Sequence, residues 1–261
     1  MAADRAGRRT VFIWGLVAQQ AALRGARVSV ADVCAAAVAA LPISGAGLTA
    51  ATAQAPAGRA RARHVMCVTD ELSEKIEEWQ LTFGEGPCVD AVTSFGPVLT
   101  SDVGTGDAGR RWPGFAPSAC RAGVAAIFAF PLQIGAIRVG ALDLYRIRPG
   151  PLSGPELGDA LVLADTATLL LLDGQDQAAG SPGALGGPAG QPMELAAHRA
   201  EIDQATGMLT EQLSTDIEDA FVRLRAYAYG HDRPLNDVAR DIVAGRLRLG
   251  ADTLPSIDDE E

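Results

Sequence analysis

The chain has 261 residues, of which 48% are hydrophobic and 21% charged, and its formal net charge is −10. This composition is typical of a globular protein, and the chain is long enough for two domains with buried cores. No apolar run approaches the roughly 18 residues that a membrane helix needs, so we expect a cytoplasmic protein that does not bind a membrane.

The first two thirds of the chain alternate helical and extended patterns. Helices are predicted at about 11–24, 29–41, 71–81 and 153–173. Strands are predicted at 45–52, 63–70, 97–100, 124–133 and 137–146, and the last two make the clearest hairpin. Within 71–81, Leu72, Ile76, Trp79 and Leu81 are expected on one side of the helix. Helices at both ends of these strands predict an α+β domain with an antiparallel sheet flanked by helices.

A stretch with six glycines and three prolines, residues 174–192, predicts a flexible linker. Beyond it, apolar residues recur at helical spacing in three short segments, which predicts a small all-α three-helix bundle. We therefore divide the chain into an N-terminal helix, an α+β domain, the linker, the bundle and an acidic tail, at 1–27, 28–173, 174–192, 193–249 and 250–261.

No arrangement of residues points to catalysis. The cysteines (Cys34, Cys67, Cys88 and Cys120) are scattered without a C-x-x-C pair, which argues against a zinc site and a disulfide framework. Cys88 follows a turn and is expected to be a buried structural thiol. The G-x-G-x-x-G match at 104–109 lacks the preceding strand and following helix of a dinucleotide site, so we expect a loop. The prediction is a protein that is not an enzyme and has no metal site or identified cofactor.

Two segments of the α+β domain carry a family resemblance. FGEGPCVDAVTSFGPVLTSDV (83–103) and GVAAIFAFPLQIGAIRVGALDLYR (123–146) resemble the GAF domains of actinobacterial regulators. The resemblance implies a domain that senses a small-molecule effector or mediates dimerisation. No residue matches a known ligand signature, so the ligand-binding residues are unknown and dimerisation alone is an equal alternative.

The bundle resembles a second family more closely. QATGMLTEQLSTDIEDAFVRLRAYAYGHDRPLNDVARDIVAGRL (204–247) looks like an ANTAR domain, the RNA-binding output module of bacterial antitermination regulators. The resemblance implies binding to paired hairpins in leader transcripts. Because the linker interrupts any continuous helix from the first domain, we expect dimerisation through the helices at 11–24 and 153–172, or through an RNA that presents two sites. Where many members carry lysine this chain has Thr206, whose hydroxyl can still donate a hydrogen bond.

The charge of the bundle is compatible with that role. Residues 223–249 hold six arginines and three aspartates, whereas five acidic residues lie in the last eleven positions. RNA loops are bound by cationic and stacking side chains. The expected RNA-binding residues are Gln204, Thr206, Gly207, Arg223, Arg225, Tyr229, His231, Arg233 and Arg240.

Two alternatives remain open at this point. Three short helices with a basic face also suit a DNA-binding helical regulator. The bundle could instead dock a protein, in a ligand-sensing or interaction module that binds no nucleic acid.

Overall fold

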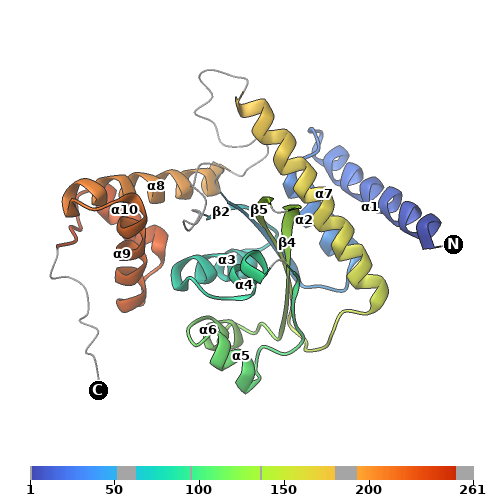
Figure 1. Cartoon of the computed structure of the whole chain (residues 1–261), viewed down its shortest axis with the longest axis horizontal. Coiled ribbons are helices and arrows are strands. Elements are labelled where there is room, and N and C mark those ends of the chain that lie inside the picture. The colour runs from blue at the N-terminus through green and yellow to red at the C-terminus, as the bar shows by residue number, and fades with distance from the viewer. Residues whose placement is uncertain (1, 52–62, 95, 136, 180–192, 251–261) are drawn as a thin grey trace.

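The computed structural model describes residues 2–51, 63–94, 96–135, 137–179 and 193–250 (Figure 1). The N-terminal part contains, in chain order, α1 (Ala2–Arg24), α2 (Val30–Ala40), β1 (Gly45–Ala51), β2 (Arg63–Val68), α3 (Glu71–Phe83), α4 (Pro87–Ser94), β3 (Val98–Thr100), α5 (Gly106–Arg111), α6 (Phe115–Arg121), β4 (Ala126–Ile134), β5 (Ile137–Arg146) and α7 (Gly154–Ala179). Within these described residues, no helix is both long and apolar enough to cross a bilayer.

The strands form one antiparallel sheet in the order β2-β1-β5-β4-β3. The predicted hairpin is confirmed, since β4 and β5 pair from Ala126↔Arg146 to Ile134↔Ile137. Successive side chains of a strand point to opposite faces, so this sheet buries two apolar surfaces. The expected α+β domain with a helix-flanked antiparallel sheet is therefore confirmed.

Each face of the sheet has its own helices. Phe128, Phe130 and Leu132 pack with α1, α2 and α7, whereas Ile127 and Ala129 face the layer that contains α3 to α6. Figure 1 shows the two helical layers on opposite sides of the sheet. The layer with α3 is the one that lies beside the C-terminal helices.

The C-terminal part contains α8 (Met193–Leu213), α9 (Ile217–Gly230) and α10 (Leu235–Val243). Its core is a single apolar cluster to which all three helices contribute, with Ala205, Leu224 and Val238 among its fully buried members. The predicted three-helix bundle is confirmed.

Three details differ from the sequence-based expectations. Residues 106–111 of the predicted loop form the short helix α5, because the Thr105 hydroxyl caps it by accepting from the amide of Ala108. Helix α7 continues to Ala179 and so includes the first residues assigned to the linker, while 180–192 lie outside the described residues. Cys34 and Cys67 form a disulfide between α2 and β2, which was not predicted because the two cysteines are far apart in the sequence.

Candidate nucleic-acid interface

The residues expected to bind RNA lie on all three C-terminal helices, and α8 holds the first group. Gln204 and Gly207 are exposed, whereas Thr206 is only 5% exposed and its hydroxyl donates to the carbonyl oxygen of Ile202 at 2.7 Å. Thr206 therefore lies on the apolar stripe of α8, and its contact with RNA stays a prediction. An added Cβ at Gly207 would meet no heavy atom within 4 Å, so among the described residues no other backbone approaches it.

Two of the predicted RNA-binding residues on helix α9 contact helix α3. The Asp216 carboxylate starts the helix by accepting from the amides of Glu218 and Asp219. Arg225 and Tyr229 are four residues apart and so lie on one side of the helix. On that side the Arg225 Nε donates to the Thr82 carbonyl oxygen at 3.2 Å.

The same contact continues at the end of α3. The Phe83 and Tyr229 rings meet edge to face with their centroids 5.4 Å apart, although Tyr229 stays 58% exposed. Leu81 packs against the apolar cluster of the C-terminal helices, and α3 and α9 lie side by side in Figure 1. Leu81 therefore points away from Leu72 and Ile76, which pack inside the N-terminal domain, so placing all of these on one side was wrong.

Glu78 links α3 to the start of α10. The N-cap residue of α10 is Pro234, which offers no side-chain hydrogen bond, and the Glu78 carboxyl lies near the amides of Leu235 and Asn236, which lower its pKa. Burial raises the pKa of Glu78 to about 7, and the nearby charges of Asp237 and Glu74 add to the rise. A carboxyl group of the N-terminal domain thus lies at the N-terminus of a helix of the C-terminal domain.

This contact between Glu78 and α10 is expected to weaken as the pH rises. The folded arrangement holds the Glu78 proton up to about pH 7, whereas an undocked carboxyl releases it near 4.5. The docked state therefore binds more protons, so the contact is strongest below pH 4.5 and weakens progressively until about pH 7. Hydrogen exchange at Leu235 and Asn236, corrected for the intrinsic rate, should report this loss. Glu78→Gln keeps an acceptor but cannot ionise, and an unchanged pH dependence in this variant would contradict the assignment.

The remaining predicted residues lie around the end of α9 and along α10. Arg233 pairs with Asp241 at 2.6 Å, and Arg240 pairs with Asp237 at 3.0 Å and with Glu201. The guanidinium groups of Arg233 and Arg246 lower the pKa of Asp241 through hydrogen bonds. Because exposed ion pairs contribute little stability, phosphate oxygens can replace these carboxylates at small cost.

Two further predicted residues complete the set. The exposed His231 ring stacks on Tyr227 with centroids 3.9 Å apart, and Arg223 is half-buried on α9. The structure thus separates the predicted residues into the buried Thr206, a pair held against α3, and an exposed or half-buried group on α8, α9 and α10, which we call the exposed group. The contact residues Glu78, Leu81 and Phe83 were missed, because the partner helix lies beyond the linker.

Residues 194–243 match the family model of the ANTAR domain, so the chain carries an ANTAR domain that spans α8 to α10. No curated protein matches the chain.

Solved structures are similar to the N-terminal part at low identity. The GAF domain of a phosphoenolpyruvate-protein phosphotransferase from Coxiella burnetii is 15% identical, with a TM-score of 0.48, over 65% of this chain and 98% of that one. The GAF domain of the Acinetobacter phosphoenolpyruvate-protein phosphotransferase is 11% identical, with a TM-score of 0.44, over 69% and 97%. A free methionine-R-sulfoxide reductase from Thermoplasma acidophilum is 15% identical, with a TM-score of 0.35, over 49% and 78%.

Proposed function

We propose that the chain is a cytoplasmic RNA-binding regulator of transcription antitermination. Its ANTAR domain would bind paired hairpins in leader transcripts, and its N-terminal GAF-type domain would sense a small-molecule effector. The observation that carries the proposal is the ANTAR match, because it covers the three helices that present the predicted arginines and aromatic rings. Unstacked loop bases lie on aromatic or guanidinium planes, and arginines bind the backbone phosphates.

The exposed group offers the side chains for a first encounter with RNA. Gln204 and Gly207 supply a polar and closely approachable stretch of α8, and His231 lies beyond the end of α9. Arg233 and Arg240 supply positive charge that, among the described residues, is paired with carboxylates of the same domain. Arg223 on α9 also belongs to the exposed group, because no described hydrogen bond joins it to α3.

We infer that the N-terminal domain controls RNA binding by holding Arg225 and Tyr229. Both residues contact the end of α3, so RNA and α3 compete for the same side chains. An effector that shifts α3 would change how often this surface is available, since a ligand moves an equilibrium by its differential affinity for the two states.

The function is tested by sequencing the RNA that cross-links to the protein in its own host, followed by gel shifts with the recovered transcript. A leader RNA with two hairpins should bind more tightly than unrelated RNA, and its affinity should fall steeply with salt. Arg225→Ala and Arg233→Ala should weaken binding. Equal binding to unrelated RNA overturns the proposal, displacement by duplex DNA supports a DNA-binding regulator, and salt-insensitive capture of a protein supports an interaction module.

Gly207→Ala separates helix stability from RNA contact. Alanine should stabilise the C-terminal domain by about 1 kcal/mol, because glycine is a poor helix former and the added methyl group meets no neighbour. RNA affinity should nevertheless fall several-fold if a nucleotide backbone approaches this position. Chemical unfolding and fluorescence anisotropy measure the two effects. The matched control is Gly109→Ala in α5, which is equally open, and loss of RNA binding in both variants would contradict the contact.

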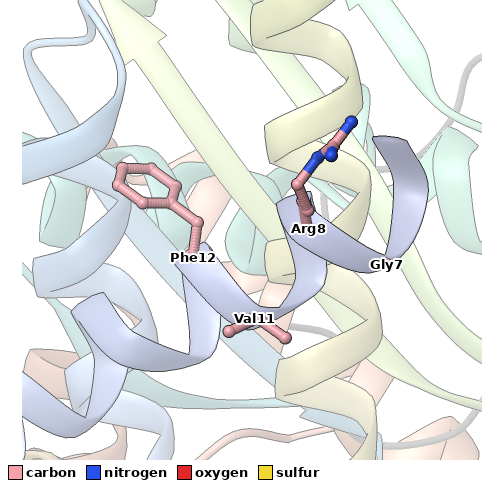
Figure 2. A pocket seen from close by; sticks show the side chains of 4 residues that line it. All are labelled: Gly7, Arg8, Val11 and Phe12. Atoms are coloured by element: carbon pink, nitrogen blue, oxygen red, sulfur yellow. The ribbon is translucent and has the colours of Figure 1, made fainter. Parts of the chain in front are cut away.

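We propose that two copies of the chain associate through α1 and α7. The two helices pack together, and each has exposed apolar side chains, including Val11 and Phe12 on α1 and Leu161 and Leu169 on α7. Figure 2 shows Arg8, Val11 and Phe12 projecting from α1, and together with Gly7 these residues line a shallow pocket. Exposed apolar side chains gathered on neighbouring helices favour association of this kind.

Phe12→Asp should shift the chain from dimer to monomer in sedimentation velocity, because the new charge would have to be buried in the interface. Leu99→Asp makes a similar change at an exposed position of β3 and should leave the mass unchanged. A wild-type protein that sediments as a monomer at all concentrations would rule out the dimer.

A further inference from the structure

A buried cluster of oxygen and sulfur atoms that could bind a metal lies between the sheet and helices α3 and α4, away from the predicted RNA-binding residues. Glu77 on α3, Cys88 on α4 and Asp143 on β5 each contribute one oxygen or sulfur atom, and these atoms lie within 4.8 Å of one another. The residues are 1%, 1% and 3% exposed. Two carboxyl groups and a thiol from three separate elements therefore meet in the protein interior.

The surrounding residues hold this cluster in place. Gln80 donates through Nε2 to the Asp143 Oδ2 at 2.5 Å, and its Oε1 accepts from the Cys88 amide at 2.7 Å. One side chain of α3 thus fixes both α4 and the carboxylate on β5. The Thr49 hydroxyl lies 3.5 Å from the Cys88 Sγ and completes the polar lining.

Gly47 makes room for the Glu77 carboxylate. Gly47 on β1 lies opposite Asp143 in the strand register, and an added Cβ there would collide with the Glu77 carboxylate. Glycine is used where another group must approach the backbone closely. The sheet is therefore shaped to receive Glu77 beside Asp143, although two adjacent buried carboxylates repel each other when both are ionised.

We propose that Glu77, Cys88 and Asp143 bind a divalent transition metal ion. One thiolate and two carboxylates are a donor set that zinc and ferrous iron accept, and a cation would neutralise the buried negative charge. Ligand atoms lie about 2.0–2.3 Å from such an ion, so two of them are roughly 3.3–3.8 Å apart in a tetrahedral site. The three atoms of the cluster lie within 4.8 Å of one another, and side-chain rotations that draw them together would close the site. Three protein ligands leave one tetrahedral position for water or an exogenous donor.

Metal binding is also expected to affect how the N-terminal domain controls the ANTAR domain. Helix α3 carries Glu77 into the cluster and, one residue later, Glu78 to the start of α10. Metal binding that draws in Glu77 is therefore expected to change the contact with the ANTAR domain. This consequence rests on the proposed function, whereas metal binding itself does not.

The test uses chelator-treated full-length protein under a non-thiol reductant. Calorimetric titration with Zn²⁺ should show one ion per chain, and Co²⁺ should give a thiolate-to-metal charge-transfer band. Cys88→Ser should abolish the band, and Asp143→Asn should weaken Zn²⁺ binding by more than the roughly 10–100-fold expected for loss of an outer partner. The exposed thiol of Cys120 provides the control, since Cys120→Ser should retain both signals.

Glu77→Gln keeps the proposal testable where a variant fails to fold. Removing one of two neighbouring buried charges should leave the metal-free protein at least as stable, while the Zn²⁺ affinity falls. Absence of stoichiometric Zn²⁺ uptake by the wild type, or a charge-transfer band that persists in Cys88→Ser, overturns the site. Failure of RNA binding alone leaves these readouts unaffected and counts only against the proposed function.

Discussion

Leu81→Asp is expected to raise the RNA affinity of the full-length protein about tenfold, which is within the usual range of coupling between two sites. Leu81 packs against the apolar cluster of the ANTAR domain, so aspartate would place a charge at the centre of the contact between α3 and the C-terminal helices. The contact should open and release Arg225 and Tyr229 to bind RNA. Fluorescence anisotropy with the cross-linked leader RNA measures the change.

Leu99→Asp is the matched control, because it introduces the same charge at an exposed residue far from the ANTAR contact in sequence. Its RNA affinity should equal that of the wild type. If Leu81→Asp opens the contact by hydrogen exchange but leaves RNA affinity unchanged or lower, α3 does not compete with RNA and the control mechanism is wrong.

Gly84→Ala is expected to disturb the same contact between α3 and α9 at the backbone that ends α3. Gly84 ends α3 with φ +67°, and an added Cβ would collide with the Arg225 guanidinium. Gly25 has φ +63° and no atom within 4 Å of its added Cβ, so Gly25→Ala carries the same backbone strain without the collision. We expect the RNA affinity to rise only for Gly84→Ala. An equal rise in both variants would assign the effect to strain.

The sheet and the bundle could be predicted because their signals are local. Nearly continuous apolar runs in 124–146 indicate a hairpin with two buried faces, and helical spacing in 193–249 indicates three amphipathic helices. Thr206 shows the limit of this reasoning. A threonine inside a helix can satisfy its hydroxyl on the preceding turn, as Thr206 does on Ile202, and can then be buried at no polar cost.

The contact between the domains had one signal in the sequence. Leu81 follows Leu72 by two and a half turns of an α-helix, so it had to lie on the opposite side and needed another partner. The identity of that partner could not be predicted, because α9 lies beyond the linker and nothing local relates the two. The buried cluster is non-local in the same way. Cys88 meets Glu77 and Asp143 only through strand register and helix packing, which cysteine spacing does not report.

Gly140→Ala is expected to lower the free energy of unfolding of the N-terminal domain by at least about 3 kcal/mol, in the upper range for single substitutions. Gly140 on β5 lies opposite Ala50 on β1, and an added Cβ would collide with the Thr49 carbonyl oxygen and lie 3.0 Å from the Ala50 Cα. These atoms belong to the backbone of a central strand, so no side-chain rotation relieves the overlap. The strands must separate or shift.

The same change should also remove metal binding, and for a geometric reason. Pairing of β1 with β5 places Gly47 opposite Asp143, and Gly47 admits Glu77 to the cluster. Urea unfolding followed by tryptophan fluorescence, together with Zn²⁺ titration, measures both losses. Gly109→Ala is the control, since it adds the same methyl group in open space and should not destabilise the domain. Wild-type stability in Gly140→Ala would show that β1 and β5 do not pair in this register, and the cluster that depends on it would lose its support.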